Sequence, residues 1–380
     1  MSALAGHRPG RVQALPTPAS RRLALLGTGT VGVAFVERYL RLRSAGYGLP
    51  PVAWLANSRG VQSGEGALSQ WLARANAAPR RAQAPQGWAE AGALDAGDIV
   101  VDATASEAVA DWHRHWLGQG VQVVTANKLG HGALLSRSQA IVQAQREGGA
   151  GYGDAATVGA GLPLLASLRA LVAGGDRIHA VEGVLSGSLA WLFNHYDGSG
   201  PFSGLVRQAG QAGYTEPDPR IDLSGEDVRR KLLILARAAG LPLQVGQVQV
   251  ESLVPATLAA APADAVDGLL ESLDGPMAER LRQAAAAGAR LRFIGRFDAQ
   301  GASVGLRALP ADHPLCAGSG TDNRVAIHSD RYDVQPLVIQ GPGAGAGVTA
   351  AALLDDVLKI TGGRAAAPVC ETATDGQVPG

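Results

Sequence analysis

A short apolar run that leads directly into a glycine turn and then a helix restricts the fold of this chain more than any other feature. Residues 23–26 are apolar, a GxGxxG turn follows at once, and Phe35, Val36 and Tyr39 then recur at helical spacing. A strand, a glycine turn and a helix in this order are typical of a dinucleotide-binding Rossmann unit, in which the helix N-terminus faces the pyrophosphate. The predicted phosphate contacts are the six residues of the turn, Gly27, Thr28, Gly29, Thr30, Val31 and Gly32.

The residues after the second predicted strand indicate which dinucleotide is bound. Residues 51–56 read as that strand, and they end in Asn57, Ser58 and Arg59. An NAD-selective site usually carries a carboxylate here to bind the ribose hydroxyls. Neutral Asn57 and Ser58 beside cationic Arg59 suit a 2′-phosphate instead, so we expect NADP, with NAD as the alternative if Arg59 is simply solvated.

Two further apolar runs place polar residues at the same edge of the predicted parallel sheet. Residues 98–104 form a buried-type strand with Thr104 and Ser106 at its carboxyl end. Residues 121–124 form the next strand, and Lys128 follows it. Open α/β sheets bind ligands at the carboxyl ends of their strands. We therefore expect Thr104, Ser106 and Lys128 to line one crevice, although a surface lysine would fit the position of Lys128 equally well.

The pattern changes after residue 152 and indicates a second domain. Strands are expected at 178–185, 291–297, 302–309, 324–328 and 334–339, and the later ones have no helices between them. Such a run favours an antiparallel sheet and an α+β domain. The predicted fold class is therefore α/β, a Rossmann domain plus an α+β substrate and dimerisation domain, with a C-terminal helix that returns to the first domain. The expected boundaries are a disordered tail at 1–21, a nucleotide domain at 22–154, a second domain at 155–340, the returning segment at 341–360 and a disordered tail at 361–380.

The charge balance and the cysteines exclude several classes of protein. Lys plus Arg and Asp plus Glu both number 33, so the net charge is zero, and no basic field favours nucleic acid or an anionic membrane. The apolar-leaning stretch 155–175 contains Pro163 and Arg169, which argues against a membrane span. Cys316 and Cys370 show no metal-binding spacing and fit a reducing cytoplasm. The basic start of the chain lacks the apolar core of a secretory signal, although its charge alone would allow an organelle transit peptide.

The segment 213–237 combines a proline-stiffened connector with a charged helix. Pro217 and Pro219 favour extended backbone, so the carboxylates up to Asp222 are expected on a rigid, non-helical loop. Ser224 is expected to cap the helix that follows. Within this helix Asp227 and Lys231 are four residues apart and share a face. An ordinary surface ion pair would show the same spacing, so other motifs must decide between the two interpretations.

Several motifs together resemble homoserine dehydrogenase. The segments SGSLAWLFN (186–194) and GYTEPDPR (213–220) are most similar to the dehydrogenase half of aspartokinase–homoserine dehydrogenase fusions and to the short single-function form. The resemblance extends from about residue 23 to residue 360 and includes segments 125–128, 156–163, 183–188 and 341–351. It implies NAD(P)H-dependent interconversion of L-aspartate 4-semialdehyde and L-homoserine, a step toward threonine and methionine.

The same resemblance implies roles for individual residues and an assembly. Lys231 matches the proton donor, Lys128 a second active-site lysine near substrate and nicotinamide, and Glu216 the residue that binds the substrate amino group. Asp222 and Asp227 match carboxylates that bind substrate or position Lys231. It further implies a homodimer paired through the second domains. The remaining implied contacts are Gly187, Ser188 and Thr157 with substrate, Gly343 with the cofactor, and the carbonyls of Val158, Ala160 and Leu162 with a monovalent cation.

Two features leave other interpretations open. Many relatives have Glu just before the Ala-Thr-Val-Gly stretch, whereas this chain has Ala155, which puts the cation in question. Another NAD(P)-dependent amino-acid dehydrogenase of the same two-domain plan would share most of these motifs. A nucleotide sensor without catalysis would share the glycine turn, but it would not need Lys128, Glu216, Asp227 and Lys231 together.

Overall fold

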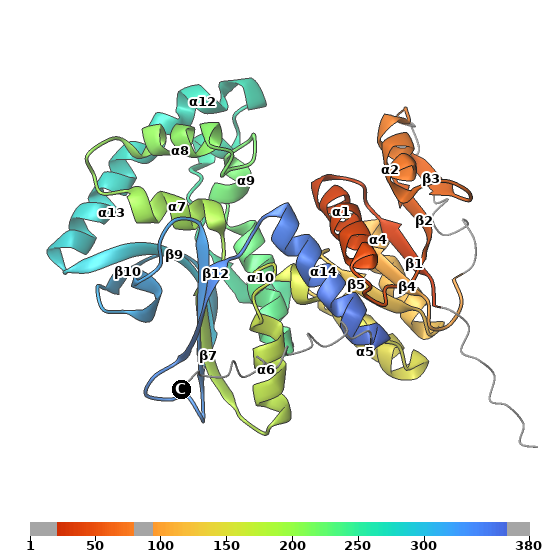
Figure 1. Ribbon diagram of the computed structural model, residues 1–380. Coiled ribbons are helices and arrows are strands. Elements are labelled where there is room, and N and C mark those ends of the chain that lie inside the picture. Colours follow the sequence, from red (N-terminus) through yellow and green to blue (C-terminus); the bar gives the residue numbers. More distant parts are fainter. Residues whose placement is uncertain (1–20, 80–93, 363–380) are drawn as a thin grey trace, which may run out of the picture.

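The computed structural model of the chain describes residues 21–79 and 94–362. These residues form two six-stranded sheets, each with its own helices (Figure 1). The tails expected at 1–21 and 361–380 lie almost entirely outside the described residues.

The first sheet is parallel apart from one edge strand. Its order is β3-β2-β1-β4-β5-β6, and all of its pairings are parallel except the hairpin between β2 and β3. The four strands expected at 23–26, 51–56, 98–104 and 121–124 are present, whereas the short β3 and β6 were not expected. The strands are β1 (Leu23–Leu26), β2 (Val52–Asn57), β3 (Gly60–Ser63), β4 (Ile99–Asp102), β5 (Gln122–Thr125) and β6 (Tyr152–Gly153).

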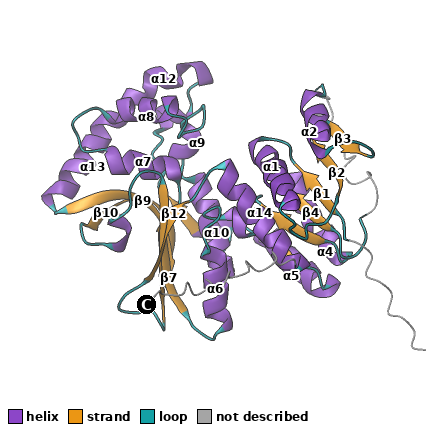
Figure 2. Cartoon of the chain, in the orientation of Figure 1, coloured by secondary structure: helices purple, strands orange, loops and turns teal. Residues whose placement is uncertain are grey.

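Helices cover both faces of this sheet (Figure 2). Because side chains alternate along a strand, Leu23 and Leu25 of β1 pack beneath α1 and the C-terminal helix α14 (Ala346–Thr361), and Ala24 and Leu26 pack beneath α4 and α5. All four residues are buried, which explains the unbroken apolar run in the sequence. The helices of this domain are α1 (Thr30–Ser44), α2 (Leu68–Ala77), α4 (Glu107–Gly118) and α5 (Leu135–Gly148).

The second sheet is antiparallel except at one edge. Its order is β12-β11-β7-β9-β10-β8, and only the short β8 runs parallel to its neighbour, β10. The strand expected at 334–339 starts at Leu337, because Val334 is exposed in a turn and Pro336 lacks an amide donor. The strands are β7 (Ile178–Val184), β8 (Val248–Val250), β9 (Ala289–Asp298), β10 (Gly301–Pro310), β11 (Asp322–Ser329) and β12 (Leu337–Pro342).

The helices of the second domain share one large core with its sheet. Among them, α10 is buried over most of its circumference, because it lies between this sheet and the first domain. The α-helices are α6 (Leu164–Ala173), α7 (Gly187–His195), α8 (Phe202–Gln211), α9 (Arg220–Leu223), α10 (Glu226–Ala238), α11 (Ala256–Ala259), α12 (Val266–Leu269) and α13 (Asp274–Ala286). Short 3-10 turns are η1 (Ala155–Thr157), η2 (Val245–Gln247), η3 (Ala263–Ala265), η4 (Leu270–Leu273) and η5 (Pro314–Cys316).

The C-terminal helix α14 (Ala346–Thr361) leaves β12 and packs along α1 of the first domain (Figure 1). Leu353, Leu354 and Val357 bury its apolar face in the core beneath α1. This packing confirms the expected α/β fold class with a returning C-terminal helix. The exact domain boundaries at 155 and 341 stay predictions.

The start of α10 differs from the prediction. Its N-cap is Gly225, with φ +78°, and the Ser224 side chain bonds locally to Ile221 and Glu226 instead of forming a capping box. Pro219, at φ −65°, has the dihedral that begins a helix, so Arg220–Leu223 forms α9, and Asp222 is helical rather than extended. The left-handed Gly225 then separates α9 from α10.

Candidate active site

A cavity of about 440 Å³ lies at the carboxyl ends of β1, β2 and β4. Of the residues predicted to bind the cofactor, eight line it, namely Gly27, Thr28, Gly29, Asn57, Ser58, Arg59, Thr104 and Ser106. Thr30, Val31 and Gly32 lie in the first turn of α1, and Lys128 and Gly343 lie elsewhere, outside this lining. The cavity therefore occupies the place where an open α/β sheet binds its ligand.

Each of the three glycines of the turn occupies a position with a different geometric requirement. Gly27 has φ +95°, and a Cβ there would lie 2.7 Å from the Ala103 carbonyl oxygen. A Cβ on Gly32 would lie 2.0 Å from the carbonyl oxygen of Gly27. Gly29 has no atom within 4 Å of its Cβ position, so its backbone faces open space. The turn therefore packs closely against the protein at Gly27 and Gly32 and leaves room for a ligand at Gly29.

Asn57 and Arg59 are held in place by hydrogen bonds at the end of β2. The Asn57 amide donates to Thr28 Oγ1 (2.7 Å) and to the Ala75 carbonyl (3.0 Å). The Arg59 guanidinium donates to the carbonyls of Asn76 and Ala78, at the C-terminal end of α2. Helix C-termini favour cations, so Arg59 is fixed at the rim of the cavity rather than freely solvated.

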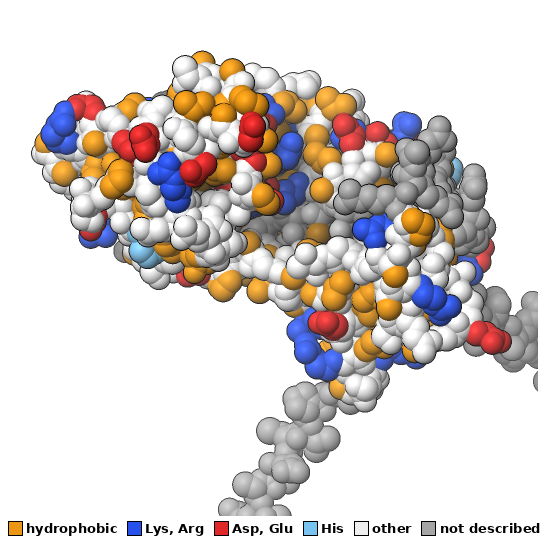
Figure 3. Space-filling model, turned by 90° about the horizontal axis from the view of Figure 1, so that it is seen from above, with side chains coloured by type: hydrophobic (Ala, Val, Ile, Leu, Met, Phe, Trp, Pro, Cys, Tyr) orange, Lys and Arg blue, Asp and Glu red, His pale blue; other side chains and the backbone are white. Residues whose placement is uncertain are grey.

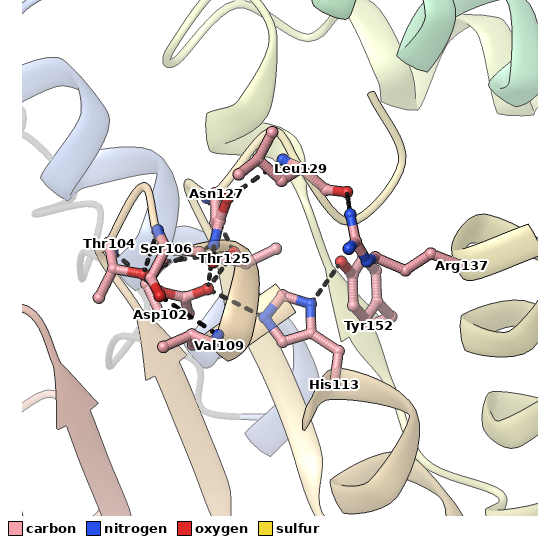
Figure 4. A network of polar contacts seen from close by, with 10 residues as sticks. All are labelled: Asp102, Thr104, Ser106, Val109, His113, Thr125, Asn127, Leu129, Arg137 and Tyr152. Carbon is pink, nitrogen blue, oxygen red and sulfur yellow. Dashed lines mark hydrogen bonds and ion pairs between the residues drawn. The ribbon is translucent and has the colours of Figure 1, made fainter. Parts of the chain in front are cut away.

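A buried carboxylate that sequence reasoning missed joins the cofactor cavity to the Lys128 loop (Figure 4). Asp102 is buried at the end of β4, where Oδ1 accepts from the Thr104 amide (2.8 Å) and Oδ2 accepts from Asn127 Nδ2 (3.0 Å). His113 Nε2 lies 2.9 Å from Oδ2, and its Nδ1 lies 3.0 Å from the Tyr152 hydroxyl. The network fixes the backbone that follows β4 and the backbone that follows β5. The aspartate at the end of an apolar strand was the available signal, but the network joins it to His113, Asn127 and, through His113, Tyr152, which lie in other segments.

Two lysines from the two domains meet at one carboxylate. Lys128, in the loop after β5, places Nζ 3.4 Å from Asp227 Oδ1, and Lys231 of α10 places Nζ 2.8 Å from Asp227 Oδ2. Lys231 Nζ also donates to the Leu185 carbonyl at 2.6 Å. Seen from above, the surface is hollowed between the two domains, with charged side chains on its walls (Figure 3).

The charge state of Asp227 follows from these neighbours. Its side chain is 41 % exposed but lies between the domains, and the resulting desolvation raises its pKa. The charges of Lys231 and Lys128 outweigh this effect and hold the pKa of Asp227 far below its usual range. The carboxylate is therefore ionised at neutral pH and holds two ammonium groups, one from each domain.

Arg237 fixes α10 against the loop that carries Lys128. Its guanidinium donates to the carbonyls of His131 and Ala133 (the latter at 2.8 Å) and to the Leu243 carbonyl at 2.8 Å. Burial lowers the pKa of His131 to about 4, so this loop residue is neutral at pH 7. The hydrogen bonds of Arg237 therefore hold α10, which carries Lys231, against the loop that carries Lys128. Sequence reasoning placed Arg237 only at the end of a helix and missed this contact.

Four of the residues expected to bind substrate, Gly187, Ser188, Asp222 and Glu216, are connected at the N-terminus of α7, where Gly187 is the first residue. Ser188 Oγ donates to Asp222 Oδ1 (2.7 Å), and Asp222 Oδ2 accepts from the Glu216 amide (2.9 Å). Asp222 therefore connects α7 to the backbone of the Glu216 loop. Thr157 is buried in η1, and its hydroxyl donates to the Asp154 carbonyl at 2.7 Å.

The segment expected to bind a cation has an unusual backbone. Ala160 has φ +48° and Gly159 has φ +69°, so two successive residues are left-handed in a buried turn. The Leu162 carbonyl already accepts from the Leu164 amide (2.8 Å), so Val158 and Ala160 fit a carbonyl-bound cation better than Leu162 does.

Within residues 21–79 and 94–362, no cluster of three His, Cys, Asp or Glu side chains could hold a metal ion. In the same part of the chain, no helix is long and apolar enough to cross a membrane.

Comparisons with known proteins identify both halves of the chain. Residues 163–358 match the family described as homoserine dehydrogenase, and residues 27–152 match the homoserine dehydrogenase NAD binding domain. A bifunctional aspartokinase/homoserine dehydrogenase from Zea mays chloroplasts is 44 % identical over 265 residues, which is 69 % of this chain and 29 % of that protein. The chain thus spans less than a third of the length of this bifunctional relative.

Two other proteins match along most of their length. Homoserine dehydrogenase from Emericella nidulans is 37 % identical over 365 residues, covering 89 % of this chain and 97 % of that enzyme. The crystal structure of a protein of unknown function from Candida auris superposes with a TM-score of 0.79 at 34 % identity, covering 90 % and 98 % of the two chains. On the two matched halves and the full-length relative, the chain belongs to the homoserine dehydrogenase family.

Proposed function

We propose that this protein interconverts L-aspartate 4-semialdehyde and L-homoserine with a nicotinamide cofactor. The observation that carries the proposal is the meeting of Lys128 and Lys231, from separate domains, on the carboxylate of Asp227. An aldehyde oxygen that becomes an alkoxide needs a proton donor and nearby positive charge. The two ammonium groups supply both at one position.

Lys231 is the proton donor in this scheme. An ammonium group has three N–H donors, and those of Lys231 serve the Leu185 carbonyl at 2.6 Å and Asp227 at 2.8 Å. The third donor is left for the substrate oxygen, and the other two fix its direction. In the reverse direction the same nitrogen takes the proton back from the homoserine hydroxyl.

The remaining residues hold the reactants. The glycine turn, Thr104 and Ser106 line the cavity that fits a dinucleotide, and a nicotinamide bound there supplies the hydride for the aldehyde carbon. The carboxylate of Glu216 binds the substrate amino group. Asp222 fixes the loop that carries Glu216, because its carboxylate accepts a hydrogen bond from the backbone amide of Glu216. Gly187, Ser188 and Thr157 complete the substrate site. Asp227 keeps both lysines in place without entering the reaction.

An assay with three amino acids tests the proposal. The purified chain is mixed with NADP⁺ and L-homoserine, L-aspartate or L-glutamate, and the absorbance of reduced nicotinamide is followed. We expect reduction with homoserine alone. Turnover of aspartate or glutamate instead would indicate another amino-acid dehydrogenase. Cofactor binding by fluorescence without turnover of any of the three would indicate a nucleotide sensor.

NADP is the proposed cofactor because Arg59 is fixed at the rim of the cavity by carbonyls of α2. In an Arg59→Ala variant, we expect the ratio of kcat/KM for NADP to that for NAD to fall about tenfold or more, as for the loss of one charge-assisted hydrogen bond. Arg74→Ala removes a cation from the exposed face of the same helix, and its ratio should not change. An unchanged ratio in Arg59→Ala would contradict the assignment.

A homodimer through the second domain is also proposed. Val181, Phe293 and Val325 direct one face of this sheet to the helical core, so alternate residues such as Glu182 and Arg296 lie on the opposite face. Packing of a second copy would cover that face. Light scattering at the working concentration should give twice the mass of one chain, and the mass of a single chain would refute the dimer.

Two finer assignments are extensions of the same proposal. A monovalent cation would be bound by the carbonyls of Val158 and Ala160, where the backbone is left-handed, with Leu162 a weaker third ligand. The cytoplasm is the proposed compartment, because the described Cys316 is a free, buried thiol.

A further inference from the structure

Asn323 is a buried amide that the scheme above does not use. It lies in the second position of β11 and is 0 % exposed. Its Nδ2 donates to the Leu185 carbonyl at 3.1 Å, and this is the same carbonyl that accepts from Lys231 Nζ at 2.6 Å. A carbonyl oxygen has two lone pairs, so the lysine and the asparagine satisfy both.

The other half of this amide lacks a partner. Among the hydrogen bonds of the described residues, Asn323 Oδ1 has none, although the atom is buried. A buried acceptor without a donor destabilises a fold, and an apolar side chain of similar size would avoid that penalty. The unpaired Oδ1 of Asn323 therefore lowers the stability of the fold. What the amide provides in return, and an apolar side chain could not, is the hydrogen bond to the Leu185 carbonyl.

A glycine holds the amide in its orientation. A Cβ on Gly343 would lie 2.0 Å from Asn323 Cγ and 2.1 Å from Oδ1, so the backbone of Gly343 packs directly on the amide group. The neighbouring backbone is fixed as well, because Asn323 pairs with Gly341 in the sheet. The Asn323 side chain thus has little freedom to turn away from Leu185.

We propose that Asn323 is a positioning residue for Lys231, acting through the Leu185 carbonyl. Leu185 lies in the short connection between β7 and α7, and its carbonyl is one of the two groups that orient the ammonium. Asn323 keeps this carbonyl aimed at Lys231, while Asp227 holds the ammonium from the other side at 2.8 Å. The third N–H then points at the reacting oxygen in a fixed direction. Gly343, predicted from the sequence to contact the cofactor, has this packing role.

The inference rests on the proposed reaction, so homoserine turnover by the unchanged chain is measured first. A failure of the proposed function would appear there, and a failure of this inference would appear only in the variants. Asn323→Leu removes the amide at similar size, and Asn323→Ala removes it without any added bulk. Asn194→Leu is the matched control, because the Asn194 amide also donates to a backbone carbonyl in this domain (Gly320, 2.9 Å), away from Lys231.

We expect both Asn323 variants to lower kcat about tenfold, the effect of one misplaced hydrogen bond, while KM for homoserine and for NADP changes less than about twofold. The solvent deuterium isotope effect on kcat should increase, because proton transfer by a poorly aimed Lys231 then limits turnover. Asn194→Leu should change neither kcat nor the solvent isotope effect. A kcat and isotope effect in the Asn323 variants equal to those of the control would overturn the inference, whatever the change in thermal stability.

Discussion

Replacing Lys231 with methionine is expected to lower kcat by about 10²–10⁴-fold, the range over which a positioned general acid contributes. Methionine fills the space of the lysine stem in the buried wall of α10, so the fold should persist. KM for homoserine should change little, because the groups proposed to bind the amino acid, Glu216 and the α7 N-terminus, are unchanged. Steady-state kinetics by nicotinamide absorbance, with circular dichroism to verify folding, measures both quantities.

Lys359→Met is the control for this prediction. Lys359 is a lysine on a helix, α14, that also pairs with an aspartate, Asp356 at 3.1 Å, but its side chain is exposed. Its replacement should leave kcat unchanged, since its ion pair involves none of Lys128, Asp227 and Lys231. Comparable rates for Lys231→Met and the unchanged chain would rule out Lys231 as the proton donor.

The backbone of the first domain was predictable because its signals are local. The apolar run 23–26, the glycines at 27, 29 and 32, and the helical spacing after them each lie within one short segment. Strand β3 was missed because it is an edge strand, GVQS, with a single large apolar residue, and β6 was missed because it has only two residues. Ser224 has the residue type of a helix cap, so it was predicted to cap α10. The N-cap is instead Gly225, whose φ of +78° separates α9 from α10.

The cofactor cavity was predictable from the glycine turn and the strand ends, whereas the meeting of the two lysines was not predictable from residue spacing. Spacing alone placed Asp227 and Lys231 on one helix face and could not bring Lys128 to them, because that contact joins residues 99 positions apart. The Asp102 network was missed for the same reason, since Asp102, His113, Asn127 and Tyr152 come from separate segments that meet only in the folded sheet. Long-range polar contacts of this kind leave no periodic trace in a sequence.

Contacts between the domains also determine the distance between the lysines. Arg237 binds the Lys128 loop from α10, and Arg169 of α6 binds Asp154, which directly follows β6. The two arginines lie on different helices of the second domain and reach different segments of the first. The approach of Lys128 to Asp227 therefore depends on pairs that take no part in the chemistry.

Arg169→Met should destabilise the protein at neutral pH by about 3 kcal/mol, near the lower end of the effect of breaking a buried ion pair. Asp154 is 1 % exposed and binds Arg169 through two hydrogen bonds of 2.6 Å, so the variant leaves a buried carboxylate unpaired. The Arg169 side chain is 47 % exposed, and screening by water keeps the effect at the lower end of the range. Urea unfolding at pH 7 measures the loss against the unchanged chain.

The same pair predicts how that loss depends on pH. Burial alone would raise the pKa of Asp154, but the Arg169 guanidinium outweighs it and holds the pKa below its usual value. The pair therefore stabilises the fold above the unfolded pKa of about 3.9, and this contribution is lost as the pH falls through the folded pKa. In Arg169→Met the guanidinium no longer outweighs burial, so the pKa of Asp154 rises and its protonation relieves the variant in acid. The difference in unfolding free energy should consequently be smaller at pH 4 than at pH 7.

Arg177→Met, which breaks the exposed pair with Asp330, should match the unchanged chain at both pH values. An equal loss at pH 4 and pH 7 in Arg169→Met would show that packing, and not the charge of Asp154, is what Arg169 supplies.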